Sequence, residues 1–121
     1  MAEPSSPSSL PGAGGFVTAL AENVLLPGSG RTLHLEGHTI ALFNIEGEYF
    51  AMDDRCPHRG GPLGAGWVEG TQVFCPLHGW AFDVKTGQGV TNCEKNVRTY
   101  ATRLSGGFVQ INISNPGKTV L

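Results

Sequence analysis

Two pairs of residues in this chain combine types and spacing that could do chemistry. One residue lies between Cys56 and His58, and two residues lie between Cys75 and His78. Sixteen residues separate His58 from Cys75. Thiolate is a soft metal ligand and imidazole a borderline one, so a Cys and a His this close on one loop can converge on a metal centre. Glycines follow each pair and leave the backbone free to turn N–H groups toward sulfur. The spacing therefore predicts two ligand loops.

The elements that must position these loops are expected to be strands. Glycine is abundant, with 18 residues, and apolar residues alternate or cluster in short runs broken by Gly, Pro, Asn and Asp. That pattern is typical of a many-stranded antiparallel protein, and no long stretch has helical periodicity. We expect an all-β antiparallel sandwich or small barrel. Its predicted strands are Phe16 to Ala21, Arg31 to Leu35, Thr39 to Ile45, Tyr49 to Asp53, Gln72 to Phe74, Trp80 to Asp83, Val97 to Arg103 and Phe108 to Ile113.

The rest of the chain divides into a ligand-bearing segment and two tails. Arg55 to Gly66, rich in Gly and Pro, should hold no regular element, and it carries the first ligand pair. Residues 1–15, rich in Pro, Ser and Gly, are expected to form a flexible N-terminal tail. Residues 16–113 would form one domain of ordinary size, and 114–121 a loose C-terminal tail.

Charge and hydropathy set limits on partners and location. Eight basic against ten acidic side chains give a net charge of −2, so we expect no nucleic acid and no anionic membrane as a partner. The longest apolar stretches, such as Ile40 to Phe43, are far too short for a signal sequence or a membrane span. The expected location is the cytoplasm.

The two ligand loops and their flanks resemble the Rieske family. That family's pattern is Cys-x-His, about sixteen residues, then Cys-x-x-His. The likeness includes the surrounding sequences CPHRGGPLGAGWVEG and CPLHGWAFDVKTGQ. The resemblance runs from about residue 16 to 113 and implies the Rieske fold with two cluster-binding loops. It also implies one 2Fe-2S cluster, with Cys56 and Cys75 on one iron and His58 and His78 on the other. Histidine ligation raises the reduction potential relative to an all-cysteine cluster.

The resemblance predicts a soluble one-electron carrier, a component of an oxidoreductase system rather than a complete enzyme. Oxygenases of this family need a second iron held by two histidines and a carboxylate in a much longer chain, whereas only His34 and His38 remain here. The expected donor is a flavin- or NAD(P)H-dependent reductase and the expected acceptor a terminal oxygenase. The alternative is the small subunit of an NADH-dependent nitrite reductase, assembled with its large subunit.

Two further interpretations of the cysteines and histidines remain open at this point. Two Cys and two His are also a zinc ligand set, so a structural zinc-binding module is a minor alternative. Zinc fingers place both cysteines before both histidines across a helix, whereas the order here is Cys, His, Cys, His on Gly- and Pro-rich loops. Cys93 is left over and is expected to be a small half-buried thiol, with a redox or ligand role as the alternative.

The apolar residues near the loops are expected to divide between core and surface. Four aromatic residues should belong to the core: Trp67, Phe74, Trp80 and Phe82. Electrons need the cluster brought close to the partner, so apolar side chains around the histidines should form the docking surface. These are Pro57, Pro62, Leu63 and Leu77.

This chain differs from high-potential members of the family it resembles at four positions, and these differences predict a low reduction potential. High-potential relatives in cytochrome bc complexes join their two loops by a disulfide, at positions that Gly61 and Leu77 occupy here. They also donate hydroxyl hydrogen bonds from a Ser and a Tyr, at positions that Trp80 and Phe82 occupy here. Hydrogen bonds to the sulfurs stabilise the reduced cluster. Without them we expect a potential near the roughly −150 mV floor of the Rieske range.

Overall fold

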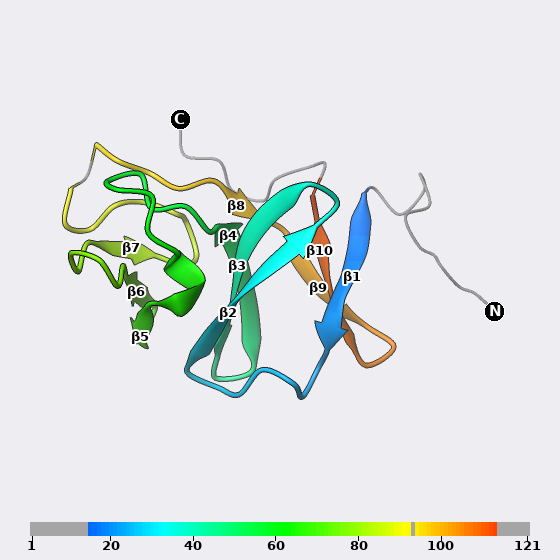
Figure 1. The fold of residues 1–121 in the computed structure, drawn as a ribbon. Helices are drawn as coiled ribbons and strands as arrows, with labels where there is room; N and C mark the ends of the chain where they lie inside the picture. The colour runs from blue at the N-terminus through cyan, green and yellow to red at the C-terminus, as the bar shows by residue number, and fades with distance from the viewer. Residues whose placement is uncertain (1–14, 93, 114–121) are drawn as a thin grey trace.

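The computed structural model describes residues 15–92 and 94–113, which form three antiparallel sheets (Figure 1). The sheets have the strand orders β1-β10-β9, β2-β3-β4-β8 and β5-β6-β7. The strands are β1 (Phe16–Ala21), β2 (Ser29–Leu35), β3 (His38–Ile45), β4 (Glu48–Asp53), β5 (Trp67–Glu69), β6 (Gln72–Phe74), β7 (Ala81–Asp83), β8 (Thr99–Tyr100), β9 (Thr102–Ser105) and β10 (Phe108–Asn112). A short 3-10 helix, η2, covers Leu63–Ala65. The predicted all-β antiparallel fold is confirmed.

The sheet that contains β3 separates two hydrophobic cores. Successive side chains of a strand point to opposite faces, and β3 is buried on both faces because its run from Ile40 to Phe43 is apolar throughout. Ile40 and Leu42 pack with side chains of β10 in one core. Ala41 and Phe43 pack with side chains of β6 and β7 in the other. The second core is the one that contains the two paired cysteines.

The small sheet β5-β6-β7 supports the ligand loops. Val73 of β6 pairs with Phe82 of β7, and both side chains are fully buried against the middle sheet. The connection between these two strands carries the second ligand pair. The segment that leaves β4 carries the first pair and returns to the small sheet through η2. Figure 1 shows both segments together at the left of the molecule, away from β1, β9 and β10.

The expectation for the segment that leads to β5 is wrong. The segment from Arg55 to Gly66 does hold regular structure, because η2 and a β-bridge between Arg55 and Pro62 lie within it. The backbone N–H of Gly64 donates to the buried carboxylate of Asp54 at 2.7 Å, which fixes this segment despite its glycines. The three-residue strand β5 was also not predicted, since it is too short to show an alternating pattern.

The expected strand from Val97 to Arg103 is two strands. β8 pairs with β4 in the middle sheet, while β9 pairs with β10 in the next sheet. The chain changes sheets at Ala101, whose carbonyl accepts a hydrogen bond from the Asn112 N–H at 2.9 Å. One continuous segment thus connects two sheets.

Some expectations concern residues outside the described ranges. The C-terminal tail at 114–121, all of the N-terminal tail at 1–15 except Gly15, and Cys93 lie outside them, so the domain limits stay a prediction. Within 15–92 and 94–113, no helix is long and apolar enough to span a membrane.

Candidate metal centre

The first ligand loop leaves β4 and turns back on itself around Cys56. The Cys56 N–H donates to the carbonyl of Gly61 at 2.9 Å, and the Gly60 N–H donates to the carbonyl of Cys56 at 2.7 Å. Gly60 has a φ of 78°, a left-handed conformation that a residue with a Cβ enters only at a cost. The turn buries Cys56 and leaves His58 half-buried at the surface.

The second ligand loop repeats this arrangement in the β6–β7 connection. The Cys75 N–H donates to the carbonyl of Trp80, and the Gly79 N–H donates to the carbonyl of Cys75, both at 2.8 Å. The two bonds span the same numbers of residues as in the first loop, and Gly79 has a φ of 75°. The histidine is the third residue of the first loop and the fourth of the second. We call this shared pair of bonds the cysteine frame.

The two frames bring the thiols together inside the protein. Cys56 is 1% exposed and Cys75 is 2% exposed, in the same core as Val73 and Phe82. Burial raises the pKa of the Cys56 thiol, and the Cys75 thiol, within hydrogen-bonding reach, adds to the rise. Thiolates buried side by side need a compensating positive charge, which metal ions supply.

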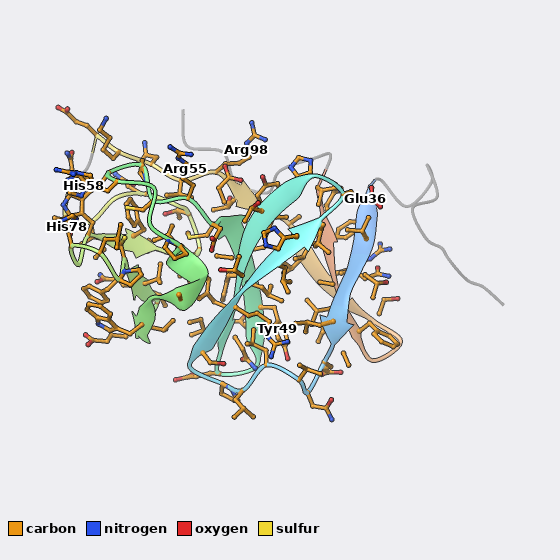
Figure 2. All side chains as sticks on the ribbon, in the orientation of Figure 1. Glu36, Tyr49, Arg55, His58, His78 and Arg98 are labelled. Carbon is orange, nitrogen blue, oxygen red and sulfur yellow. The ribbon has the colours of Figure 1, made fainter. Side chains whose placement is uncertain are left out.

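The two histidine rings form a second pair, further out. The ring centroids of His58 and His78 lie 5.1 Å apart with an angle of 70° between the planes (Figure 2). The pKa of His58 is lowered, first by desolvation and then by the charges of His78 and Arg59. A low pKa favours the neutral imidazole, which is the form that binds metal.

Trp80 holds one of these rings. Its side chain stacks on His58 with 4.0 Å between the centroids and 3° between the planes. The other aromatic residues of this region differ in burial, although the sequence predicted that all of them belong to the core. Phe82 is fully buried as expected, but Trp67 is 48% exposed and stacks on Phe74 at the surface. Leu63, expected on the docking surface, is instead fully buried because η2 turns it into the core.

Gly61 marks the closest approach of the two loops. A Cβ at this position would stand 2.8 Å from the Cys75 Sγ and 2.8 Å from the Leu77 Cγ, closer than real Cβ atoms come. Residues 61 and 77 therefore face each other across the loops. Neither is a cysteine, so no disulfide can join the loops here.

Sequence reasoning missed Asp54, which braces the first loop from behind. One oxygen of its buried carboxylate accepts hydrogen bonds from the Thr32 hydroxyl at 2.8 Å and from the Gly64 N–H at 2.7 Å. Its backbone carbonyl accepts from the Leu63 N–H at 2.7 Å. An acidic residue at the end of an apolar strand and just before the ligand loop was the available signal.

The donor set fits a two-iron centre better than a single ion. The four expected ligands form an inner pair of thiols and an outer pair of imidazoles. Rieske-type 2Fe-2S centres use two cysteines on one iron and two histidines on the other. A zinc site would need all four side chains around one ion.

Comparison with known proteins identifies the class. The family model described as the Rieske [2Fe-2S] domain matches residues 16–101. The chain belongs to the Rieske family, and this membership implies a 2Fe-2S cofactor.

The relatives include ferredoxin components of dioxygenase systems. The ferredoxin component of the naphthalene 1,2-dioxygenase system of Pseudomonas putida is 33% identical over 100 residues, covering 82% of this chain and 96% of the relative. A chain from a complex of reduced oxygenase and oxidized ferredoxin in carbazole 1,9a-dioxygenase is 25% identical with a TM-score of 0.76, covering 88% of this chain and 97% of that one. A Mycobacterium tuberculosis structure described as an NADH-dependent nitrite reductase small subunit is 26% identical with a TM-score of 0.76, covering 87% and 96%.

Proposed function

We propose that this chain is a one-electron carrier that holds one 2Fe-2S cluster through Cys56, His58, Cys75 and His78. It takes electrons from a flavin- or NAD(P)H-dependent reductase and delivers them to a terminal oxygenase. The observation that supports this most is the pairing of ligands, with both thiols in the core and both imidazoles at the surface. We place the transfer in the cytoplasm, because the proposed electron source depends on NAD(P)H.

The chain's own residues give the site its properties. When bound, the cluster supplies a reversible one-electron couple. The cysteine frames fix both loops through backbone hydrogen bonds, so the ligands need little movement when the charge changes. The buried cysteines would hold the cluster away from water, and the two histidines, which reach the surface, would hold it on the side open to a partner.

The acceptor is assigned by similarity of whole chains. The naphthalene dioxygenase ferredoxin component is matched over nearly its entire length. The carbazole dioxygenase structure contains a ferredoxin together with its oxygenase. Both relatives are therefore separate carriers, and that is the role we assign to this chain.

The second candidate is a permanent subunit of a nitrite reductase. The nitrite reductase small subunit has the same TM-score, 0.76, as the carbazole dioxygenase match. Native mass separates the two roles, since a carrier elutes from cell extract as a small free protein. A subunit elutes with a large partner that carries its own cofactors.

The proposal is tested on anaerobically purified protein. We expect equal amounts of iron and acid-labile sulfide, about two of each per chain, and uptake of one electron per chain in a reductive titration. NADH with the reductase of the naphthalene dioxygenase system should bleach the visible spectrum, and the terminal oxygenase of that system should restore it. Zinc without sulfide, or a cluster that neither protein can reduce or oxidise, would overturn the proposal.

A further inference from the structure

Charge is distributed unevenly over this molecule. The whole chain carries a net charge of −2. Three arginines nevertheless lie in or beside the segments that hold the first ligand loop and the strand next to it. They are Arg55, Arg59 and Arg98, all exposed, and we call them the arginine edge.

Sequence position and contacts place these arginines. Arg59 directly follows His58 in the chain, and its side chain is exposed. The Arg55 guanidinium carbon lies 3.6 Å from the point where a Cβ on Gly60 would stand, so this side chain lies along the first loop.

Arg98 continues the edge beyond Arg55. The pKa of Tyr100 is raised to about 12 by burial and by its 2.5 Å hydrogen bond to Asp53, and a hydrogen bond from Arg98 opposes the rise. Arg98 therefore stands beside the Tyr100 hydroxyl. Figure 2 shows His78, His58, Arg55 and Arg98 in this order along one margin of the molecule.

The acidic residues near this margin leave it positive. Asp53 is half-buried and bonded to Tyr100, and Glu94 is followed directly by Lys95 of opposite charge. Three of the exposed acidic residues lie at the far end of the middle sheet, while Glu36 lies in the β2–β3 turn and Glu69 at the end of β5. Glu46 and Glu48 lie at the β3–β4 hairpin, and Glu22 lines a hollow there of about 560 Å³ together with Gly47 and Tyr49. The first ligand loop and the residue before β8 thus carry three exposed arginines, and the nearest exposed carboxylate in the chain, Glu94, is offset by Lys95.

We propose that the arginine edge, together with the outer faces of His58 and His78, is the docking surface for an acidic face of a redox partner. This inference rests on the proposed function and names the charge of the partner's surface. The planar guanidinium group of arginine can donate two parallel hydrogen bonds to one carboxylate. A positively charged surface also attracts a negatively charged partner before contact. The net charge of the chain alone would repel such a partner, so the attraction comes from the placement of these three side chains.

Small ions of opposite charge test the sign of this surface. The dithionite-reduced protein gives one electron either to hexacyanoferrate(III), which becomes hexacyanoferrate(II), or to hexaammineruthenium(III), which becomes hexaammineruthenium(II). Stopped-flow rates are measured between about 0.01 M and about 0.1 M salt, where the screening length falls from about 30 Å to about 10 Å. We expect the rate with the anion to fall about tenfold over this range. Net charge alone predicts that this rate rises with salt, and a rise would overturn the inference.

Matched variants assign the effect to the edge. The triple variant Arg55→Gln, Arg59→Gln, Arg98→Gln should lose the salt dependence with the anion and keep its visible spectrum. Arg103→Gln is the control, because Arg103 is also exposed but lies on β9, over the ring of Phe16. The control should keep the wild-type salt dependence. An equal loss in both variants would show a general charge effect and overturn the assignment.

A charged electrode surface, which is larger than a small ion, tests docking directly. Voltammetry of the protein on carboxylate-terminated and ammonium-terminated monolayers compares an acidic face with a basic one. We expect faster electron exchange on carboxylate, and loss of that preference in the triple variant. Faster exchange on ammonium would contradict an acidic partner. Iron and sulfide are measured first, so absence of the cluster refutes the proposed function, whereas a loaded protein with the wrong charge preference refutes only the docking surface.

Discussion

The two ligand loops have the same cysteine frame in different surroundings. In each loop the cysteine carbonyl accepts from a glycine four residues on, and the cysteine N–H donates to the carbonyl five residues on. The first loop is braced by a buried carboxylate and flanked by arginines, whereas the second is the turn of a small hairpin and carries Leu77 and Trp80. The comparison teaches that the shared frame sets ligand geometry. The unlike residues around it set stability, potential and partner contact.

The largest effect should come from removing a ligand from either loop. Replacing Cys56, His58, Cys75 or His78 by Ala should abolish or cripple cluster incorporation, because each iron of the proposed cluster would have only two protein ligands. The purified variants should be colourless and lack an electron-spin-resonance signal after reduction. Cys93→Ser is the control and should keep both, since four ligands complete the set without it. A normal spectrum in Cys75→Ala would contradict the assignment, and a lost spectrum in Cys93→Ser would move Cys93 into the site.

The second prediction concerns the buried Asp54 carboxylate, which braces the first loop. Asp54→Ala leaves the Gly64 N–H and the Thr32 hydroxyl without their buried acceptor, which should lower the free energy of unfolding by about 2 to 3 kcal/mol. Denaturant titration followed by cluster absorbance measures the change. Asp83→Ala is the matched control, because Asp83 accepts one exposed hydrogen bond, from the Lys85 N–H at 2.7 Å. Equal losses in the two variants would mean that Asp54 does not brace the loop.

The third prediction alters the second loop and concerns potential. Phe82→Tyr should raise the midpoint potential from near the roughly −150 mV floor of the family, because a hydroxyl near the sulfurs stabilises the reduced cluster. Trp80→Ser should also raise it, but this change removes the stack on His58 and so carries a larger risk to folding. Protein-film voltammetry at neutral pH measures both. A wild-type midpoint well above zero would refute the low potential and the preference for an oxygenase partner over a respiratory one.

The smallest expected effect concerns the apolar contact of the second loop. Leu77 is 52% exposed beside His78, so Leu77→Glu should slow electron delivery from a reductase at unchanged cluster content. Leu26→Glu is the control, because Leu26 is 69% exposed but lines the hollow at the far end of the middle sheet. Unimpaired transfer in the Leu77 variant, or an equal decrease in both, would place the docking face elsewhere.

Sequence patterns predicted those parts of the molecule that depend on local periodicity. The limits of β1 and β6 match their expected ranges, because alternating or β-branched residues end there at turn-forming ones. The tight connection between β3 and β4 was also visible in the sequence, at Glu46-Gly47-Glu48, although Glu48 proves to be the first residue of β4. Glycine and proline content failed as a guide to the segment before β5, since it cannot show that Asp54 reaches Gly64 and draws Leu63 into the core.

The sequence proposes the residues of the candidate site but does not show their environment. The spacing of Cys56, His58, Cys75 and His78 is visible in the sequence. The repeated cysteine frame consists of backbone hydrogen bonds, which side-chain types do not predict. The exposure of Trp67 depends on its place in a three-residue edge strand, which apolar character alone cannot reveal. The arginine edge joins residues from two distant segments and appears only once the chain is folded.

The most direct test of the ligand assignment is pulsed electron-spin resonance of the reduced protein grown with ¹⁵N-labelled histidine. The account predicts hyperfine coupling from two imidazole nitrogens bound directly to iron, with one coupling lost in any His58→Ala or His78→Ala protein that retains some cluster. Cys56 and Cys75 would hold the other iron and contribute no nitrogen. A reduced protein without strongly coupled histidine nitrogens, or one in which His34→Ala removes a coupling, would contradict it.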